Sequence, residues 1–263
     1  MKTYETAVVT GGARGIGRAI AELMVRRGYD VVLTDVDGAA ARRTADEIGA
    51  VVGLAQDVRD EGSHAMVADV ASSHGRLTAW FNNAGVGHDG ALTELSSEQV
   101  NRLVSVNLLG VIWGMRAALA AFDGKGGDIV NIASLSGHGP VPGLSVYAAT
   151  KAAVVSLTGS VHAETPRNVR VHAVCPDGVD TEMVAGMDPR GQAKALVHSG
   201  GGLLTSESVA AEAVALLGSS RVIRTLPGWR GGLVRTTALA PSLTMKGLPV
   251  FRAMGRRTIS RRG

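Results

Sequence analysis

The sequence is poor in the residues that build disulfide frameworks and metal clusters. It contains one cysteine, Cys175, and its seven histidines are scattered without the spacing of metal ligands. A single cysteine excludes an intramolecular disulfide and favours a reducing compartment. We therefore predict a cytoplasmic protein that binds no metal and carries Cys175 as a small buried apolar side chain.

Long apolar runs are also missing. No stretch approaches the roughly 18 uninterrupted apolar residues that a membrane-spanning helix needs. The N-terminal MKTYETAVVTGG runs straight into a strand pattern, without the apolar core of a signal peptide. No Gly-Lys-Ser/Thr triplet ends a glycine set, as it does in nucleotide triphosphatases. These absences argue against a membrane-spanning protein, a secreted protein and a triphosphatase.

Acidic residues are missing from one end of the chain. From Arg221 onward there are ten Lys or Arg and no Asp or Glu, which leaves 17 basic against 23 acidic residues, a net −6, before it. The overall net charge of +4 therefore describes neither part. A basic tail on an acidic body differs from the basic face of a nucleic-acid-binding domain, and we predict no nucleic-acid partner.

What the sequence does have is an alternation of short β-branched runs with longer Ala-rich amphipathic stretches. The runs include TAVVT, DVVLTD, LTAWFNNAG, GDIVNIAS and VRVHAVCP, and a helical pattern follows each. Strands that alternate with helices at this spacing form right-handed βαβ units around a mainly parallel sheet. We predict an α/β fold with a Rossmann-like, doubly wound parallel sheet in a single domain, residues 1–220, and a basic C-terminal extension, residues 221–263.

A spaced set of glycines stands between the first predicted strand and the first predicted helix. The segment TGGARGIG, residues 10–17, contains Gly11, Gly15 and Gly17, with Arg14 and Ile16 among them. Glycine permits a tight turn and the close approach of a pyrophosphate, and the helix N-terminus offers free N–H groups. A glycine set in this context is typical of dinucleotide binding.

Asp35 ends the second predicted strand, eighteen residues after Gly17. A carboxylate there accepts hydrogen bonds from the adenosine ribose and repels a 2′-phosphate, which favours NAD over NADP. Arg14 favours NADP, because a basic residue at its position can contact a 2′-phosphate. We give Asp35 more weight, since Arg14 can turn into solvent. Asp35 could instead cap a helix, but Asp37 is the better candidate for that cap.

Tyr147 stands four residues before Lys151 in SVYAATK, in a chain with three tyrosines. Positions i and i+4 of a helix lie on one face, so the two side chains can act together. Taken alone, such a pair is more often a core tyrosine and a solvated lysine. The order of the other motifs decides between these interpretations.

Six motifs occur in one order along the chain: TGGARGIG, Asp57-Val58, NNAG at 82–85, Asn107, Ser134 and YAATK. In this order, with Ser134 thirteen residues before Tyr147, residues 5 to 217 resemble the classical short-chain dehydrogenase/reductase family. The resemblance implies an NAD(P)-dependent oxidoreductase that acts on CH–OH groups.

The resemblance also implies cofactor contacts. Asp57 and Val58 would contact the adenine ring, residues 82–85 would line the cleft after the fourth strand, and Val179 and Thr181 would hold the nicotinamide carboxamide. With Asn82 as a further residue of the cleft, the predicted cofactor set is Gly11, Arg14, Gly15, Ile16, Gly17, Asp35, Asp57, Val58, Asn83, Ala84, Gly85, Tyr147, Lys151, Val179 and Thr181. The family usually has Pro-Gly where this chain has Pro176-Asp177-Gly178, so Asp177 departs from the family pattern.

The chemistry of hydride transfer accounts for four predicted catalytic residues, Asn107, Ser134, Tyr147 and Lys151. Reduction of a carbonyl leaves an alkoxide that needs a proton, and oxidation needs the reverse. A free phenol, with a pKa of about 10, is a poor base at neutral pH, but a nearby ammonium favours the phenolate. We predict Tyr147 as the acid/base, and Lys151 as the residue that lowers its pKa and binds the cofactor ribose. Ser134 would hold the substrate oxygen, and Asn107 would anchor a proton-relaying water.

The predicted function is hydride transfer between NAD(H) and a secondary alcohol or ketone. Residues 182–204 correspond to the family's variable substrate lid, whose Met, Leu and Val content favours an apolar, lipid-like or steroid-like substrate. Its glycines imply a lid that moves. Two alternatives stay open: an NADP-dependent ketone reductase, and a catalytically silent dinucleotide-binding regulator, which should have lost Ser134, Tyr147 or Lys151.

Assembly and the tail complete the predictions. The resemblance implies a homo-oligomer, commonly a tetramer, built on the helices around Asn107 and Tyr147 and on a last strand. That strand has no clear counterpart in RVIRTLPGWRGGLVRT, so we predict a homodimer. Residues 232–263 mix apolar and basic side chains. We expect the tail to pack on the acidic body or on the partner subunit, with a peripheral membrane contact and disorder as the alternatives.

Overall fold

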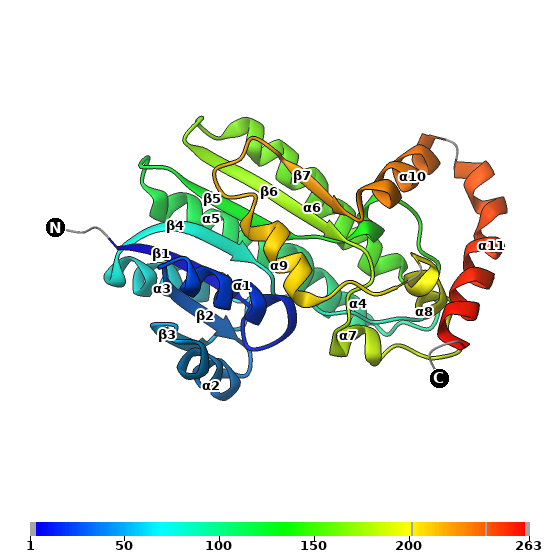
Figure 1. Cartoon of the computed structure of the whole chain (residues 1–263), viewed down its shortest axis with the longest axis horizontal. Coiled ribbons are helices and arrows are strands. Elements are labelled where there is room, and N and C mark those ends of the chain that lie inside the picture. Colours follow the sequence, from blue (N-terminus) through cyan, green and yellow to red (C-terminus); the bar gives the residue numbers. More distant parts are fainter. Residues whose placement is uncertain (1–3, 201, 240, 261–263) are drawn as a thin grey trace.

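The computed structural model describes residues 4–200, 202–239 and 241–260. Its strands form a seven-stranded parallel sheet in the order β3-β2-β1-β4-β5-β6-β7 (Figure 1). The strands are β1 Glu5–Thr10, β2 Asp30–Asp35, β3 Val52–Ala55, β4 Arg76–Asn82, β5 Gly127–Ile132, β6 Val169–Pro176 and β7 Ile223–Leu226. The predicted Rossmann-like, doubly wound fold is confirmed.

Helices cover both faces of this sheet. Those before the lid are α1 Gly15–Arg26, α2 Gly38–Ile48, α3 Glu61–His74, α4 Ser97–Val104, the π-helical turn η1 Ser105–Leu109, α5 Gly110–Phe122, the 3-10 turn η2 Leu135–His138 and α6 Ser145–Glu164. The rest are α7 Glu182–Ala185, α8 Gln192–Val197, the 3-10 turn η3 His198–Gly200, α9 Ser206–Val214, α10 Gly228–Leu239 and α11 Pro241–Ser260.

Two apolar cores hold these layers together. Helices α1 and α9 bury Ile20, Met24 and Val209 on one face of the sheet. Helices α3, α5 and α6 bury side chains such as Met115 and Val154 on the other. Because both faces are covered, the central strands are apolar on both sides, which explains their unbroken β-branched runs.

The strand order reverses beside β1. The chain runs outward from β1 to β2 and β3 and then crosses back to β4 on the other side of β1. The loops after β1 and β4 therefore diverge at the carboxyl edge, where open α/β sheets bind their ligands. Thr10 links the two strands, since the backbone N–H groups of Asn83 and Ala84 each donate to its Oγ1 at 3.1 Å.

The seventh strand corrects two expectations. β7 pairs in parallel with β6, from Ala173 opposite Ile223 to Pro176 opposite Leu226. Residues 223–226 therefore belong to the sheet rather than to a C-terminal extension, and the prediction that the last strand has no counterpart is wrong. The strand is short and contains Arg224, whose charge hides the strand pattern. The Arg224 guanidinium is held by Glu212 of α9 at 2.7 Å.

The helices after β7 lie across the carboxyl edge of the sheet. α10 begins directly after Pro227, and α11 runs beside α8 and η3 (Figure 1). Residues 228–260 therefore stand at the same edge as the crevice between the β1 and β4 loops.

Among the described residues, one helix is long and apolar enough to cross a membrane by length and composition alone. It is Ser97–Phe122, which joins α4, η1 and α5. It packs on α3, α6 and β4 and buries Leu103, Met115 and Phe122. These contacts are those of a core helix.

Candidate active site

The carboxyl edge of the sheet holds a cavity of about 1230 Å³. It is bordered by the glycine turn, the ends of β2, β5 and β6, the loop after β4, the start of α6, the lid, and helices α10 and α11. Of the fifteen predicted cofactor contacts, all except Gly17 line this cavity. Of the four predicted catalytic residues, all except Asn107 line it.

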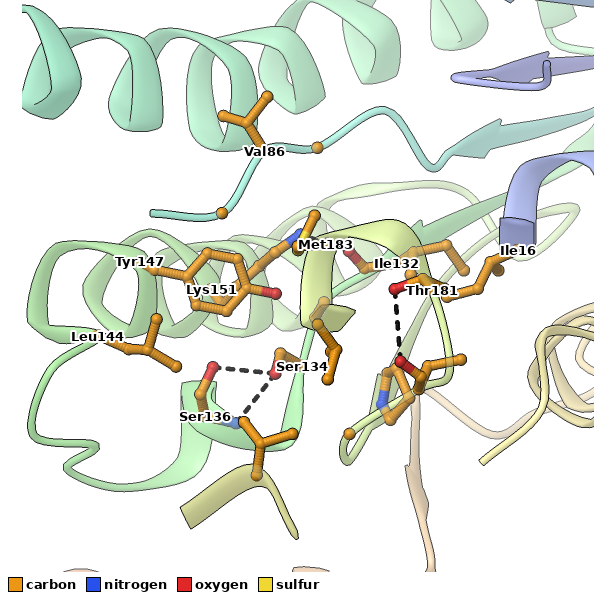
Figure 2. Close-up of a pocket in the computed structure, with 18 of the residues that line it drawn as sticks. Ile16, Val86, Ile132, Ser134, Ser136, Leu144, Tyr147, Lys151, Thr181 and Met183 are labelled. Carbon is orange, nitrogen blue, oxygen red and sulfur yellow. Dashed lines mark hydrogen bonds between the residues drawn. The ribbon is translucent and has the colours of Figure 1, made fainter. Parts of the chain in front are cut away.

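Tyr147 and Lys151 share one face of α6, as predicted. The Lys151 Nζ lies 5.7 Å from the centre of the Tyr147 ring. It donates a 2.8 Å hydrogen bond to the Ile132 carbonyl at the end of β5, and the lysine is buried. Figure 2 shows both side chains beside Ser134. Strand β5 and helix α6 thus bring the serine, the tyrosine and the lysine to one place.

Burial changes the proton affinity of both groups. It lowers the pKa of Lys151 from 10.5 to about 8. It also raises the pKa of Tyr147, and the hydrogen bond with Ser134 only partly opposes this. For the protein on its own, burial has the larger effect on the phenol, and the lowering of its pKa by Lys151 during turnover stays a prediction. Both side chains are shielded from solvent, and this desolvation disfavours the charged phenolate and the charged ammonium alike.

Ser134 follows the end of β5 and starts the 3-10 turn η2. Its Oγ accepts hydrogen bonds from the Ser136 backbone N–H (3.2 Å) and the Ser136 hydroxyl (2.9 Å), as Figure 2 shows. With its lone pairs engaged, the Ser134 hydroxyl can direct its own proton toward a substrate oxygen. Ser136 was missed from the sequence, although the second serine of SLSG was its signal.

Asn107 lies in the π-helical turn between α4 and α5 and is fully buried. Its Oδ1 accepts from the Val86 N–H at 2.8 Å, and its Nδ2 donates to the Val86 carbonyl at 2.9 Å. The amide thus holds the loop after β4, close to Lys151: a Cβ on Gly85 would lie 3.4 Å from Asn107 Oδ1 and 3.6 Å from Lys151 Nζ. The water-anchoring role of Asn107 stays a prediction.

The glycine turn has the form that a pyrophosphate needs. Gly15 has a φ of +55°, which favours glycine, and a Cβ on Gly17 would lie 2.1 Å from the Gly11 carbonyl oxygen. Asn83 donates through Nδ2 to the carbonyls of Thr10 (3.0 Å) and Gly11 (2.9 Å), which fixes the turn. The first turn of α1 has no acid and no side-chain cap, so its N–H groups fit an anion.

Asp35 is held at the end of β2. Its carboxylate accepts hydrogen bonds from the N–H groups of Ala13 and Asp37, at 3.3 and 3.2 Å. Asp37 caps α2, as predicted, by accepting from the Ala40 N–H at 2.9 Å. The Asp35 carboxylate therefore has a fixed place at the cavity.

The ion-pair partner of Arg14 is an acidic residue of the lid. The Arg14 guanidinium forms this ion pair with Glu182 at the start of the lid helix α7. Both side chains are exposed. Arg14 therefore already has an anionic partner at the mouth of the cavity.

Asp57 and Val58 both line the cavity, where the predicted adenine contacts belong. The Asp57 carboxylate is held by the guanidinium of Arg59, with Nε at 2.9 Å. This hydrogen bond lowers the pKa of Asp57. Asp57 is therefore a fixed anionic wall of the cavity, and its contact with adenine stays a prediction.

Asn82 does not line the cavity, contrary to prediction. Its Nδ2 donates to Asn131 Oδ1 and its Oδ1 accepts from Trp80 Nε1, both at 2.8 Å. The side chain is buried and ties β4 to β5. Successive strand residues point to opposite faces, so Asn82 turns into the core while Asn83 reaches the glycine turn.

The segment after β6 forms another wall of the cavity. Val179 makes a parallel bridge with Leu204, and Thr181 Oγ1 donates to the Val179 carbonyl at 3.3 Å. Both line the cavity, and their carboxamide contacts stay predictions. Asp177 pairs instead with Arg230 of α10, at 3.0 Å.

The lid side of the cavity is mainly apolar. Its apolar lining residues are Val86, Val141, Leu144, Met183, Met187, Val197, Leu233, Val234 and Phe251. Figure 2 shows Val86, Leu144 and Met183 around Tyr147. The last three lining residues come from α10 and α11, and no local sequence pattern indicated that they reach the site.

Among the described residues, no group of three or more His, Cys, Asp or Glu side chains is placed to hold a metal ion. Cys175 is buried, as predicted, and burial raises the pKa of its thiol to about 12. The thiol therefore stays protonated at neutral pH.

The chain is similar to known proteins in sequence and in fold. The family model of the short chain dehydrogenase matches residues 5–191. A sorbitol dehydrogenase of Cereibacter sphaeroides is 39% identical over 204 residues, which are 72% of this chain and 80% of that protein. A short chain dehydrogenase/reductase from Burkholderia phymatum in complex with NAD has a TM-score of 0.80 and 30% identity, over 92% of this chain and 95% of the other. An actinorhodin polyketide ketoreductase with NADPH has a TM-score of 0.77 and 28% identity, over 87% of this chain and 97% of the other.

Proposed function

The chain belongs to the short-chain dehydrogenase/reductase family, and from that premise we propose that it transfers a hydride between NAD(H) and an apolar secondary alcohol or ketone. As a family member it is a dehydrogenase/reductase that uses a nicotinamide dinucleotide and acts on CH–OH groups. The observation that carries the proposal is that Ser134, Tyr147 and Lys151 line one cavity together with the glycine turn.

The side chains of the cavity account for the proton transfer. In reduction, Ser134 donates a hydrogen bond to the carbonyl oxygen, and Tyr147 gives its proton to that oxygen as the alcohol forms. In oxidation, Tyr147 takes the proton back. The nicotinamide, when bound, supplies or accepts the hydride. Because burial raises the pKa of Tyr147, the phenol carries its proton at neutral pH and can supply the proton that reduction needs.

Lys151 supports the phenolate that reduction leaves on Tyr147. Its Nζ is held by the Ile132 carbonyl near the tyrosine ring. Burial lowers the pKa of Lys151 to about 8, so the ammonium form still predominates at pH 7. A positive charge at this distance in a closed site stabilises a developing phenolate.

The choice of NAD rests on the residues of this chain, since one solved relative holds NAD and another NADPH. The Asp35 carboxylate is fixed by two backbone N–H groups where the adenosine ribose is expected. The basic residue that would favour a 2′-phosphate, Arg14, is paired with Glu182. These contacts support NAD.

The apolar lid side of the cavity supports an apolar substrate. Leu144, Val184, Met187 and Ala193 form a buried cluster between the start of α6 and the lid, with Tyr147 packed against it. A polar substrate would leave hydroxyl groups without partners against such a wall. A ketone with an aliphatic or alicyclic body fits it.

Turnover of defined carbonyl compounds tests the proposal. Purified protein is mixed with NADH or NADPH and with aliphatic methyl ketones, cyclic ketones or small polyhydroxy ketones, and absorbance loss of the cofactor is followed. We expect turnover of the apolar ketones with NADH. Tight NADH binding without turnover of any carbonyl compound would instead indicate a dinucleotide-binding regulator, and preference for NADPH would favour the NADP-dependent alternative.

A further inference from the structure

Asp177 occupies a position at which the family resemblance expects glycine. It follows β6 at the wall of the cavity, and its N–H donates to the Leu226 carbonyl at 2.8 Å. Its carboxylate accepts from Arg230 Nε at 3.0 Å, and each of the two side chains is 11% exposed. The departure from the family pattern has thus produced a buried ion pair.

This ion pair joins three parts of the chain. Asp177 belongs to the segment after β6, and Arg230 to the first turn of α10. The Arg230 Nη2 also donates to the hydroxyl of Ser199 in η3, at the end of the lid, at 3.1 Å. A Cβ on Gly200 would lie 2.3 Å from Arg230 Nη1 and 2.8 Å from the Asp177 carboxylate, so a side chain at this position would displace the pair.

A buried ion pair costs desolvation, and its removal on one side leaves an unpaired buried charge. Burial raises the pKa of Asp177, and the charge of Arg230 opposes that effect. The pair therefore adds little net stability. Its main effect is to fix the position of the first turn of α10 relative to the cavity.

Helix α11 continues from this point and lies directly on the lid. A Cβ on Gly255 would lie 1.7 Å from the Ala195 carbonyl oxygen of α8, so the two backbones are in close contact. Arg252 Nη1 donates to Gln192 Oε1 at 2.9 Å. Phe251, directly before Arg252 on this helix, lines the cavity. The family match ends at residue 191, so this wall is built by a segment outside it.

We propose that Asp177 and Arg230 are positioning residues that hold α10 and α11 over the cavity, where Phe251 is a specificity residue for the apolar part of the substrate. This inference rests on the proposed function for its substrate class. The segment after β7 then serves as a second lid wall beside α7 and α8, and it favours substrates whose apolar body extends beyond the carbonyl.

The docking of α11 is tested without substrate, by limited trypsin cleavage of the full-length protein. In Arg230→Ala we expect cleavage after Arg252, Arg256 and Arg257 to accelerate by about tenfold or more, because cleavage follows the population of the undocked helix. Arg221→Ala is the control: it removes an exposed arginine that lies before β7, outside α10 and α11, and this variant should be cleaved like the wild type. Equal cleavage of both variants would overturn the docking role.

Asp177→Asn provides the second variant, since it keeps the size of the side chain and removes the charge. If Arg230→Ala does not fold, the same cleavage comparison is made with Asp177→Asn. Accelerated cleavage within α11, with the unfolding temperature still showing one cooperative transition, supports the proposal. Wild-type cleavage in a folded Asp177→Asn contradicts it.

The specificity role is tested by the ratio of kcat/KM for a long and a short methyl ketone, decan-2-one and butanone. In Phe251→Ala we expect this ratio to fall by about tenfold, because a lost apolar contact acts on the long substrate. Val250→Ala is the control, since Val250 is exposed and does not line the cavity. An unchanged ratio in Phe251→Ala overturns the role. Failure of the wild type to reduce either ketone refutes the proposed function instead, and the cleavage result still decides whether α11 docks.

Discussion

Tyr147 and Lys151 illustrate how burial and charge compete at the scale of a residue. The free protein keeps the phenol neutral, because burial raises the pKa of Tyr147 while it lowers that of Lys151 to about 8. A neutral phenol beside Ser134 is prepared to donate a proton to a carbonyl oxygen. We therefore expect the phenolate to form during turnover.

Tyr147→Phe should lower kcat by at least about 100-fold, because general acid–base catalysis contributes about 10²–10⁴-fold. The affinity for NADH, measured by fluorescence titration, should change little, since only the titratable hydroxyl is lost. Tyr4→Phe is the control, because Tyr4 is 58% exposed and lies outside the cavity. A Tyr147→Phe enzyme that keeps more than about a tenth of the wild-type rate would remove Tyr147 from the mechanism.

Asp35→Ala should raise the ratio of kcat/KM for NADPH over NADH by about tenfold, because the carboxylate no longer repels a 2′-phosphate. Asp37→Ala is the matched control: it removes the side-chain cap of α2 and should weaken that helix, without altering the cofactor ratio. A wild-type enzyme that already prefers NADPH would show that Arg14, and not Asp35, decides the choice.

At the scale of elements, the amino ends of β5 and β6 are joined by groups far from the cavity. On β5 the Asp128 carboxylate accepts from Arg170 Nε (2.7 Å) and Nη2 (2.8 Å) of β6, from His172 Nε2 (3.1 Å) and from the Gly218 N–H (3.1 Å). Burial tends to raise the pKa of Asp128, but the hydrogen bonds with His172, Arg170 and Gly218 outweigh it and lower the pKa to about 2. This cluster therefore stabilises the β5–β6 pair when Asp128 is ionised.

Acid unfolding tests the Asp128 cluster. The folded-state pKa lies below the ordinary value of 3.8, so the stabilisation is complete above pH 3.8 and is lost as the pH falls toward about 2. Asp128→Asn should lower the free energy of unfolding in urea at pH 7 by about 3 kcal/mol and weaken its dependence on pH in the acid range. Asp123→Asn, at an exposed ion pair with Lys125, should have little effect at either pH. Equal losses in both variants would contradict the argument.

The helix Ser97–Phe122 both packs in the core and holds a loop of the cavity. Its α4 and α5 parts pack in the core, while the π turn between them turns Asn107 toward Val86. π turns frequently mark functional sites, because the extra residue redirects a side chain without ending the helix. In this helix it lets a core element hold the loop that borders the cavity.

At the scale of the whole molecule, the basic C-terminal segment packs on the body. α11 lies on α8 and η3, and α10 folds back on β7, where a Cβ on Gly231 would lie 2.5 Å from Thr225 Cγ2. The packing interpretation of the tail agrees with these contacts. The charge of the segment is thereby placed beside an otherwise acidic body.

Light scattering tests the predicted homodimer. We expect twice the monomer mass, through the outer faces of α4, α5 and α6, where Leu109 is 36% exposed. Because α10 already packs against β7, a second interface through that strand is not expected. Leu109→Glu should shift the protein toward the monomer, since it places a charge in an apolar interface. A stable tetramer would contradict the prediction.

Peripheral membrane contact through the tail stays a separate prediction. Val250 and Met254 on α11 are exposed, and Arg256 and Arg257 lie beside them on the same helix. Each basic residue near an anionic surface is worth about 1 kcal/mol. We expect sedimentation with anionic vesicles at low salt that weakens at physiological salt and is reduced in Val250→Glu/Met254→Glu. Equal sedimentation of this variant and the wild type, or none by either, would refute the contact.

The sequence by itself determined the fold class, the glycine turn, the cap at Asp37 and the positions of Ser134, Tyr147 and Lys151. Ser134, Tyr147 and Lys151 were identified by the order of six motifs along the chain. The other features depend on patterns within a few residues of one another: period-two and period-3.6 hydrophobicity, and glycines at a strand–helix junction. Such local patterns can be recognised in the sequence without knowledge of any distant contact.

Only the tertiary structure decided the rest, because the rest depends on contacts between distant residues and on exclusion of water. β7 is a strand because β6 pairs with it and Glu212 holds its arginine, although its own four residues barely favour one. Asn82 turns into the core because its partners are on β4 and β5. The raised pKa of Tyr147 follows from the burial of its side chain. Phe251 lines the cavity because α11, which is distant in sequence from Tyr147, packs on the lid.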